Sequence, residues 1–450
     1  MTDRPEAGPG AGDAAGDLVL RRARLAPGAQ PSDLLVLRGE IAEIGPALAA
    51  PAGVPELDAH GALVRPPFVE PHVHLDSTLA LSDRYRNRSG TLWEGIERWT
   101  QIRPTLTRED VLGRAEELIR WQVAHGTLFV CSHVDAGDPA HVALRALVEL
   151  RERVRDVVEL QLVAFPQEGL VSNPHGPALL DRALELGADV VGGIPHYEPT
   201  REDAVRSLEL VFERADRHGR AIDVHCDEVD DPVSRNLEVM ASMAMRAGGG
   251  RRVTASHTSA MGSYEAAYAD KVIHLTRRAG LCVVANPLVN ITLQGRFDAY
   301  PKRRGITQVK ELWRAGVCVA FGHDDVLDPW YPLGVASPLD VASMGVHVAH
   351  MTAPEEIAEA LEMVSTRAAT VLDLGDRYGL DVGRPGSFVV LESADAADLV
   401  RRRPLPRWVV ARGRVVAATE PARTEVSLSG EREEVDFRQR PREDYARRAQ

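Results

Sequence analysis

Eight short apolar runs, rich in β-branched residues, recur between residues 67 and 325 with helical segments between them. Most lie about 30 residues apart, and one longer interval follows the first run. The runs are FVEPHVHLD, TLFVCSHVD, ELQLVAFPQEG, ADVVGGIPH, AIDVHCDE, RRVTASHT, LCVVANPL and VCVAFGHDD. Such runs are typical of strands that are buried on both faces of a parallel sheet. Eight strand–helix units predict an α/β fold, a (β/α)8 TIM barrel, at residues 67–375.

Helix-capping residues in the intervening segments support this prediction. Thr107 and Gly126 bracket TREDVLGRAEELIRWQVAHG, and Thr200 and Gly219 bracket TREDAVRSLELVFERADRHG. Threonine is a favoured N-cap, and glycine commonly follows the last turn of a helix. The longer first interval predicts an inserted loop and helix at roughly 76–106.

Both ends of the chain have a different pattern from the barrel. Residues 18–66 and 376–425 contain short β-like pieces divided by Gly and Pro, such as DLLVLRGEIAEIG and RWVVARGRVVAAT. We predict that these pieces pair as antiparallel strands into one small β-sandwich-like domain built from both chain ends. Residues 1–17, rich in Gly, Ala and Pro, are expected to be a disordered tail, and the charged residues 426–450 a peripheral C-terminal tail.

The composition narrows the possible partners. With 44% hydrophobic and 26% charged residues, the chain reads as an ordinary globular protein, and its net charge of −13 argues against a nucleic-acid-binding surface. No stretch approaches the roughly 20 apolar residues of a membrane span, and the N-terminus lacks the order of a signal peptide. The four cysteines form no CxxC pair and are expected to be reduced. We therefore expect a cytoplasmic protein that acts on a small molecule.

Polar residues close several of the runs, at the barrel end where chemistry collects. His72 and His74 have i, i+2 spacing, so both imidazoles leave the strand on one face and can share a metal. His225, His257 and a carboxylate at the end of the eighth run lie on the same rim. A lone histidine here would more often be structural, but the set together predicts a metal site. Zinc and iron(II) both take imidazole and carboxylate ligands.

The number of metal ions follows from the lysines. Some barrels of this type bridge two metals with a carboxylated lysine at the end of the fourth strand. The fourth run, ADVVGGIPH, contains no lysine, and the three lysines of the chain, Lys271, Lys302 and Lys310, all come much later. One metal is therefore the better interpretation.

Three further residues are candidates for the active site. Glu228, in HCDEVDD, follows a strand that ends in a predicted ligand and can move protons without binding the metal. Because three aspartates crowd the same segment, a solvated acidic loop is the alternative interpretation. Gln167 offers a donor and an acceptor to an amide-like ring edge, and Trp330 can form the wall of a pocket or simply pack in the core.

Two adjacent aspartates, Asp324 and Asp325, end the eighth run. In an extended strand neighbouring side chains point to opposite faces. The two carboxylates are therefore expected to have different roles, and the preceding His323 is expected to point away from the metal.

The motifs PHVHLD, AFPQEG, IDVHCDEVDD, VTASHT, QGRFDAYPKRRGIT and HDDVLDPWYP resemble those of the bacterial cytosine deaminases, in the amidohydrolase superfamily. The similarity runs from about residue 60 to residue 375. An HxH motif alone would indicate only the superfamily, whereas the QGRFDAYPKRRGIT and HDDVLDPWYP segments are more specific.

The resemblance implies a metal site and a reaction. It implies that His72, His74, His225 and Asp324 bind one divalent metal ion, iron(II) or zinc. The implied reaction converts cytosine to uracil and ammonia, in pyrimidine salvage, by attack of a metal-bound hydroxide on ring atom C4. The resemblance also implies a homo-oligomer.

The same resemblance implies a role for each other candidate. Glu228 would carry protons to and from the ring, and His257 would help Asp324 to activate the water. The substrate-binding residues would be Gln167, Asp325 and Trp330.

Several alternatives stay open. Within the deaminases, the ring could be isoguanine, 5-methylcytosine or creatinine. A cyclic amidohydrolase that opens a ring amide is disfavoured by the missing lysine. The zinc deaminases with a PCxxC signature are excluded, because the sequence has no CxxC. A metal-binding or scaffold protein on an inactive barrel is disfavoured because every position of the predicted site is occupied.

Overall fold

The computed structural model describes residues 16–428 and 430–439. Its largest sheet contains eight strands that are ordered as in the chain, and all neighbours in it are parallel. They are β6 (Phe68–Val73), β7 (Thr127–Asp135), β8 (Glu159–Phe165), β9 (Val190–Gly193), β10 (Ala221–Cys226), β11 (Val253–His257), β12 (Cys282–Ala285) and β13 (Cys318–Phe321). Each strand falls inside one of the eight apolar runs, so the predicted TIM barrel is confirmed.

The first and last strands of the sheet meet at a seam that closes the barrel. Val73 pairs with Asp324 in a parallel bridge. The Asp324 N–H donates to the His72 carbonyl at 2.8 Å, and the Asp324 carbonyl accepts from the His74 N–H at 3.1 Å. The backbone just past β13 therefore lies directly beside the end of β6.

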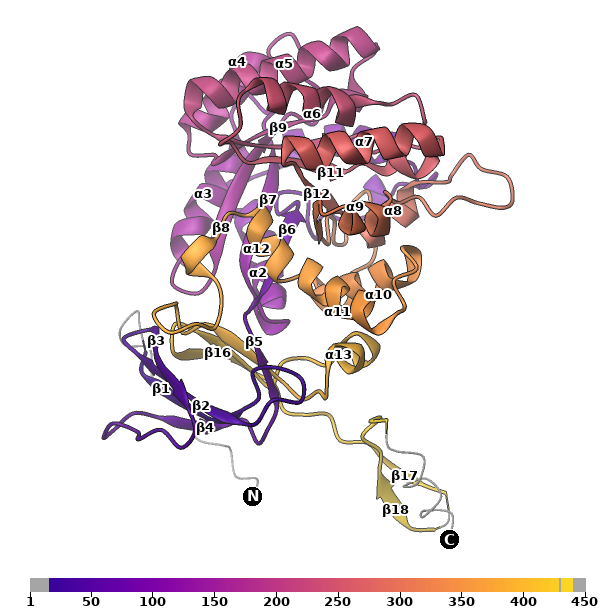
Figure 1. The fold of residues 1–450 in the computed structure, drawn as a ribbon. Coiled ribbons are helices and arrows are strands. Elements are labelled where there is room, and N and C mark those ends of the chain that lie inside the picture. The colour runs from indigo at the N-terminus through magenta and orange to yellow at the C-terminus, as the bar shows by residue number, and fades with distance from the viewer. Residues whose placement is uncertain (1–15, 429, 440–450) are drawn as a thin grey trace.

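Helices surround the sheet on its outside (Figure 1). They are α1 (Leu92–Ile102), α2 (Arg108–Ala124), α3 (Val142–Val154), α4 (Gly176–Glu185), α5 (Arg201–His218), α6 (Asn236–Arg246), α7 (Ala266–Ala279), α8 (Pro287–Leu293), α9 (Val309–Arg314), α10 (Pro338–Val348), α11 (Pro354–Met363) and α12 (Thr366–Val371). The predicted capping is confirmed: the Thr107 and Thr200 side chains each accept a backbone N–H, and Gly219 ends α5 in a left-handed conformation. Helix α1 belongs to the predicted insertion after the first strand.

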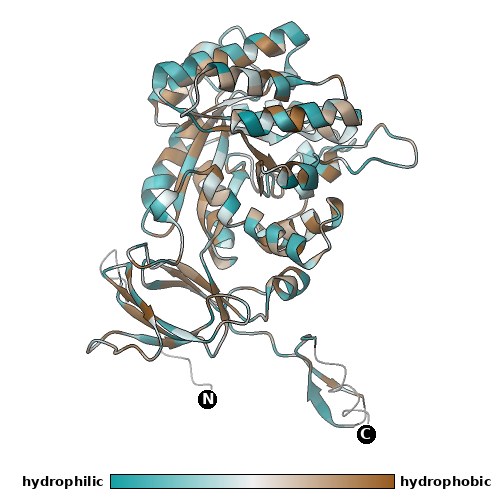
Figure 2. Cartoon of the chain, in the orientation of Figure 1, coloured by the Kyte–Doolittle hydropathy of each residue, from teal (hydrophilic) through white to brown (hydrophobic). Residues whose placement is uncertain are grey.

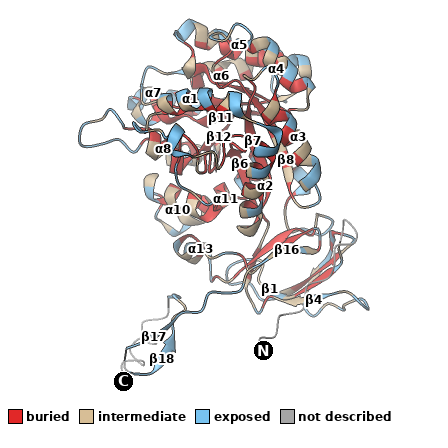
Figure 3. Cartoon of the chain, turned by 180° about the vertical axis from the view of Figure 1, so that it is seen from behind, coloured by how far each residue is buried: buried red, intermediate tan, exposed pale blue. Residues whose placement is uncertain are grey.

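The core of the barrel lies between the sheet and its helices. All nine residues of β7 are buried, as expected for a strand covered on both faces. Figures 2 and 3 show the same pattern around the barrel, with apolar buried strands inside and helices whose polar residues face outward.

The small domain consists of two four-stranded sheets, ordered β3-β2-β1-β4 and β16-β15-β14-β5. The strands of the first sheet are β1 (Leu18–Ala23), β2 (Ser32–Leu37), β3 (Glu40–Gly45) and β4 (Glu56–Asp58). Those of the second are β5 (Leu63–Arg65), β14 (Phe388–Leu391), β15 (Trp408–Ala411) and β16 (Arg414–Ala418). Because β5 pairs with β14, and Leu20 and Leu34 share a core with Phe388 and Val410, both chain ends build this unit as predicted.

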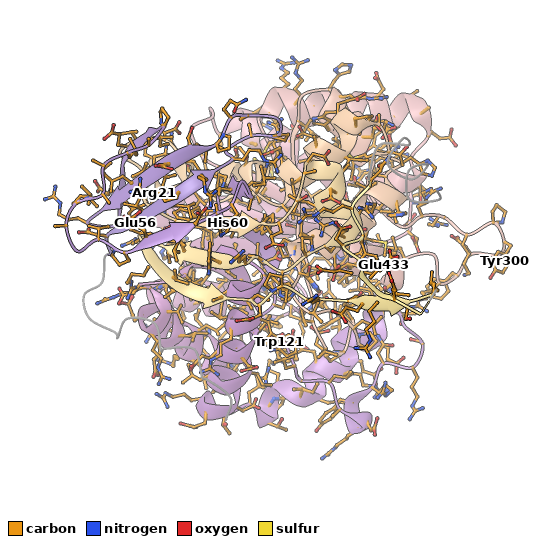
Figure 4. The ribbon with its side chains drawn as sticks, turned by 90° about the horizontal axis from the view of Figure 1, so that it is seen from below. Arg21, Glu56, His60, Trp121, Tyr300 and Glu433 are labelled. Atoms are coloured by element: carbon orange, nitrogen blue, oxygen red, sulfur yellow. The ribbon has the colours of Figure 1, made fainter. Side chains whose placement is uncertain are left out.

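One pairing in the small domain differs from the antiparallel expectation. Strands β1 and β4 are parallel, because the chain crosses from β3 to the opposite edge of β1 between residues 46 and 55. Arg21 on β1 and Glu56 on β4 lie together in Figure 4, where the Arg21 Nε donates to Glu56 at 2.6 Å.

Other segments lie at the surface. The predicted N-terminal tail falls almost entirely outside the described residues. After α13 (Ala396–Arg402), the C-terminal region contains the exposed hairpin β17 (Glu425–Ser427) and β18 (Arg432–Glu434), which stands apart from the barrel, and residues 440–450 lie outside the described part. All four cysteines are free thiols, as expected. Within the described ranges, no helix is long and apolar enough to cross a membrane.

Candidate metal centre and active site

Four predicted ligands converge at the carboxyl end of the barrel. The Nε2 atoms of His74 and His225 are 3.0 Å apart, and Asp324 Oδ1 lies 3.3 Å from His72 Nε2 and 3.5 Å from His74 Nε2. Ligand atoms held about 2.1 Å from a tetrahedral ion lie about 3.4 Å from one another. The spacing of these side chains therefore fits one divalent metal ion.

The protonation of this cluster also fits a metal ion. Burial, followed by neighbouring histidines, lowers the pKa of His72, His74 and His225 well below the usual value, so each ring is neutral and has a free lone pair. His72 Nε2 and Asp324 Oδ2 are buried and have no hydrogen-bond partner in the described part of the chain. Because unpaired buried polar atoms are costly, a cation between them would satisfy both.

Asp324 lies at the centre of the cluster. Its carboxylate belongs to two groups of side chains whose ligand atoms all lie within 4.8 Å of one another. The first group contains His72, His225, His257 and Asp324, and the second contains His74, Asp324 and Asp325. All four ligands predicted from the sequence are present, and His257 lies beside them.

His257 is held by two asparagines that the sequence analysis did not single out. Asn290 Nδ2 donates to His257 Nδ1 at 2.9 Å, and Asn290 Oδ1 accepts the Asn286 N–H at 3.1 Å, which fixes the orientation of the amide. His257 Nδ1 lies 3.3 Å from Glu228 Oε1 and 3.8 Å from Asp324 Oδ2. The signal for the asparagines was their i, i+4 spacing in ANPLVN, on one side of the short helix after β12.

In the acidic segment after β10, Glu228 lines the cavity, and the three aspartates accept backbone hydrogen bonds. Glu228 is buried at the cavity, and burial raises its pKa to about 8. Asp227 instead accepts two backbone N–H groups at the start of α6. Asp230 accepts the N–H of Gly295, and Asp231 accepts a backbone N–H within its own loop. Glu228 is therefore not part of a solvated acidic loop.

A small cavity of about 20 Å³ lies beside the metal ligands. The predicted substrate residues Gln167, Asp325 and Trp330 all line it, together with Glu228. It adjoins a larger cavity of about 460 Å³, and Leu92 and Glu228 line both. The structure thus brings the predicted catalytic and substrate-binding residues to one place.

The remaining walls of the small cavity are apolar. They are formed by Leu92 from the start of α1, Phe165 from the end of β8 and Ile194, just after β9. These residues come from three parts of the chain and were not predicted as site residues, because single apolar residues carry no signal of function in a sequence.

The loop that carries Gln167 is fixed by a buried carboxylate. Glu198 accepts the backbone N–H groups of Leu170, Val171 and Ser172 at 2.7, 3.0 and 2.8 Å, and the Ser172 hydroxyl donates to it at 2.7 Å. A carboxylate with several such donors holds a loop firmly. Glu198 therefore fixes the segment that begins three residues after Gln167.

Alternation along a strand, the argument used to predict different roles for Asp324 and Asp325, does not hold here. Strand β13 ends at Phe321, and Asp324 has a left-handed backbone with φ of 71°, so strand alternation does not apply. Both carboxylates line the small cavity. Burial and the carboxylates of Asp324 and Asp328 raise the pKa of Asp325 well above its usual value.

The neighbours of the doublet have supporting roles. His323 Nδ1 lies 3.1 Å from the Asp325 carbonyl, and His323 belongs to neither ligand group, as predicted. Asp328 accepts the backbone N–H groups of Trp330 and Tyr331 at 3.0 Å and the Ser77 hydroxyl at 2.9 Å. These bonds fix the turn that presents Trp330.

The inserted helix α1 packs directly on Trp330. A Cβ atom added to Gly95 would lie 2.3 Å from Trp330 Cδ1, so only glycine permits the observed approach. The rings of Trp99 and Trp330 are also neighbours, with centroids 6.2 Å apart. Helix α1 thus supports one wall of the small cavity through Trp330 and forms another through Leu92.

Comparisons with known proteins show the family of this chain. A family model described as "Amidohydrolase family" matches residues 90–417. Pterin deaminase of Rhizobium rhizogenes is 30% identical over 398 residues, which cover 88% of this chain and 90% of that protein. The crystal structure of 5-methylcytosine deaminase from Klebsiella pneumoniae, liganded with 5-fluorocytosine, is 45% identical, with a TM-score of 0.87 over 90% of this chain and 98% of that chain. The N-isopropylammelide isopropylaminohydrolase of Burkholderia multivorans is 30% identical, with a TM-score of 0.79 over 90% and 98% of the two chains. The chain therefore belongs to the amidohydrolase family, whose hydrolases act on C–N bonds.

Proposed function

We propose that the chain is a metal-dependent deaminase of cytosine-type rings, which hydrolyses cytosine to uracil and ammonia or 5-methylcytosine to thymine and ammonia. The observation that carries this proposal is the small cavity, where Gln167, Glu228 and Asp325 surround a space beside the metal ligands. Their donors and acceptors suit a flat ring with an amide edge and an amino group.

A metal ion held by His72, His74, His225 and Asp324 would act as a Lewis acid and lower the pKa of water to about 7. Asp324 and His257 are placed to accept the proton of that water, because their side chains lie next to each other at the ligand cluster. No other metal chemistry is needed for the roles of the remaining residues.

Glu228 is the proposed proton carrier. Because burial raises its pKa to about 8, its carboxyl group is mostly protonated at neutral pH and can give its proton to ring atom N3. The water proton held by Asp324 and His257 then goes to the departing amine, and the Glu228 carboxylate takes the remaining proton of the water, which restores its acid form. Gln167 would hydrogen-bond the amide edge of the ring, and Trp330 would cover the ring face.

The choice between the two pyrimidines depends on ring position 5. The apolar walls Leu92, Phe165 and Ile194 offer favourable contact to a methyl group, worth about 0.8 kcal/mol for each buried carbon. The similarity to a 5-methylcytosine deaminase supports the methylated base, and the sequence motifs support cytosine itself. We propose activity on both, with 5-methylcytosine preferred.

An ammonia-release screen tests this function. The zinc- or iron-loaded protein is given cytosine, 5-methylcytosine, isoguanine, creatinine and a pterin at equal concentrations. We expect the highest kcat/KM for cytosine and 5-methylcytosine. Removal of the metal by a chelator should abolish the activity, and adding back zinc or iron(II) should show which ion gives more activity. Highest activity on another ring, or a ring-opened acid without ammonia, would overturn the proposal.

We also propose a homo-oligomer, which is supported only by the resemblance of the motifs. Light scattering of the purified full-length chain measures its mass directly, and a monomer of 49.1 kDa would contradict the proposal.

A further inference from the structure

A hydrogen-bonded chain of three buried side chains lies behind the metal ligands, deeper in the barrel. It runs from His72 on β6 through Ser256 on β11 to Asp223 on β10. His72 Nδ1 lies 3.0 Å from Ser256 Oγ, and Ser256 Oγ donates to Asp223 Oδ1 at 2.8 Å. The exposed fractions of the three residues are 0%, 0% and 4%.

The backbone register explains why these residues meet. Asp223 and His225 are two positions apart on β10, so both side chains point into the barrel. Ser256 is the partner of His225 across the parallel ladder of β10 and β11. One strand thus supplies both a predicted ligand and a carboxylate one layer below it.

The direction of each hydrogen bond follows from the chemistry of the groups. A carboxylate only accepts hydrogen bonds, so the single hydroxyl proton of Ser256 points to Asp223. The Ser256 oxygen is then an acceptor toward His72, and His72 Nδ1 must carry the proton. A neutral imidazole has one N–H, so the lone pair of His72 lies on Nε2.

The free nitrogen of His72 faces the ligand cluster. His72 Nε2 lies 3.3 Å from Asp324 Oδ1 and has no hydrogen-bond partner in the described part of the chain. The ring of His133 stacks on the ring of His72, with centroids 3.8 Å apart, and His133 Nε2 is 3.5 Å from the same Asp223 oxygen. The ring of His72 is therefore held by stacking against its face and by the contact of Nδ1 with Ser256.

We propose that Ser256 and Asp223 are positioning residues that fix the tautomer and the orientation of His72 for the metal. Carboxylates that orient a metal-binding histidine usually accept its N–H directly. Here the serine hydroxyl spans the distance between β6 and the carboxylate on β10. The inference rests on the proposed function only in that it needs the metal site, and it does not depend on which ring is the substrate.

The test measures zinc affinity of the full-length apoprotein, by competition with a chromophoric chelator, and needs no substrate. Loss of such an outer partner typically weakens metal binding about 10- to 100-fold. We expect this loss for Ser256→Ala and a smaller loss for Asp223→Asn, because an asparagine oxygen can still accept from the serine. Ser207→Ala is the matched control, since Ser207 on α5 is also buried but its hydroxyl has no hydrogen-bond partner among the described residues. This variant should leave zinc affinity unchanged.

A second readout reports the tautomer directly. Long-range ¹H–¹⁵N NMR of apoprotein with ¹⁵N-labelled histidines should show one histidine in the Nδ1–H tautomer, His72. The signal of this tautomer should change in Ser256→Ala and stay the same in Ser207→Ala. This signal does not depend on overall stability, so it keeps the inference testable if Ser256→Ala has a lower melting temperature.

The outcomes separate this inference from the proposed function. A parent protein that binds neither zinc nor iron(II) would overturn the metal-dependent function. A parent that binds zinc, with a Ser256→Ala variant of equal affinity and an unchanged histidine spectrum, would overturn the positioning role alone. Two zinc ions in the parent and one in Asp223→Asn would also overturn it, because Asp223 would then be a ligand, together with His72 and His133, whose ligand atoms lie within 4.8 Å of it.

Discussion

Replacing Gly95 by alanine should disturb the active site from the outside of the cavity. The added Cβ would lie 2.3 Å from Trp330 Cδ1 and 2.4 Å from Nε1, whereas carbon atoms in contact lie about 3.5–4.0 Å apart. The indole or helix α1 must therefore move by more than about 1 Å. Overpacking of this kind costs about 1–3 kcal/mol, partly offset by the better helix propensity of alanine, about 1 kcal/mol.

The effect on catalysis should exceed the effect on stability. Movement of the indole narrows the cavity, and movement of α1 withdraws Leu92 from it. A misplacement of about 1 Å can lower the rate about 100-fold, so we expect kcat/KM of Gly95→Ala to fall by roughly that factor. Steady-state kinetics on cytosine and 5-methylcytosine, with thermal melts of the same samples, measure both quantities.

Gly113→Ala is the matched control for this experiment. Gly113 is an exposed glycine inside α2, and no atom of residues 16–428 or 430–439 lies within 4 Å of an added Cβ. This variant should be more stable by about 0.5–1 kcal/mol and fully active. If Gly95→Ala behaved in the same way, with unchanged kinetics and a raised melting temperature, the proposed support of Trp330 by α1 would be wrong.

Three other predictions concern substitutions of four carboxylates. Glu228→Gln should keep its metal content and lose about 10²- to 10⁴-fold in kcat; near-normal turnover in the ammonia assay would contradict its role as proton carrier. Asp324→Asn should lose the metal and all activity, whereas Asp325→Asn should keep the metal and change the ranking among substrates. Elemental analysis measures the metal content and the substrate screen measures the ranking. The same result for both variants would contradict the prediction. Glu198→Gln should lower the free energy of unfolding by about 2–5 kcal/mol in urea titrations, because an amide nitrogen cannot accept two of the four hydrogen bonds that the carboxylate receives, and an unchanged midpoint would count against it.

Much of the fold could be predicted because a strand that is buried on both faces has a continuous run of apolar residues in the sequence. The eight apolar runs and threonine caps such as Thr107 and Thr200 follow from local physics, and the strands appear where the runs are. The parallel pairing of β1 and β4 could not be predicted, because it depends on where residues 46–55 cross the sheet.

The site divides in the same way. His72 and His74 could be predicted from their i, i+2 spacing. The direction of the Asp324 side chain could not, because Asp324 has a left-handed backbone past the end of β13, where strand alternation does not apply. Ser256 reads as an ordinary strand residue, since its partners lie on two other strands. Gly95 gives no sign of its contact with Trp330, because 235 residues separate them and the signal is the absence of a side chain.

The seam between β6 and β13 also determines when the metal site can form during synthesis of the chain. Asp324 closes the barrel by bonding the backbone of His72 and His74, and the same residue completes the ligand cluster. Ribosomes add roughly 5–20 residues per second, so the histidines are synthesised roughly 10–50 seconds before their carboxylate partner. During that interval the nascent chain carries an HxH pair that has neither a closed barrel nor a complete set of ligands. Metal insertion should therefore follow synthesis of the last barrel strand, and ribosome-bound chains that stop before residue 324 should retain little zinc.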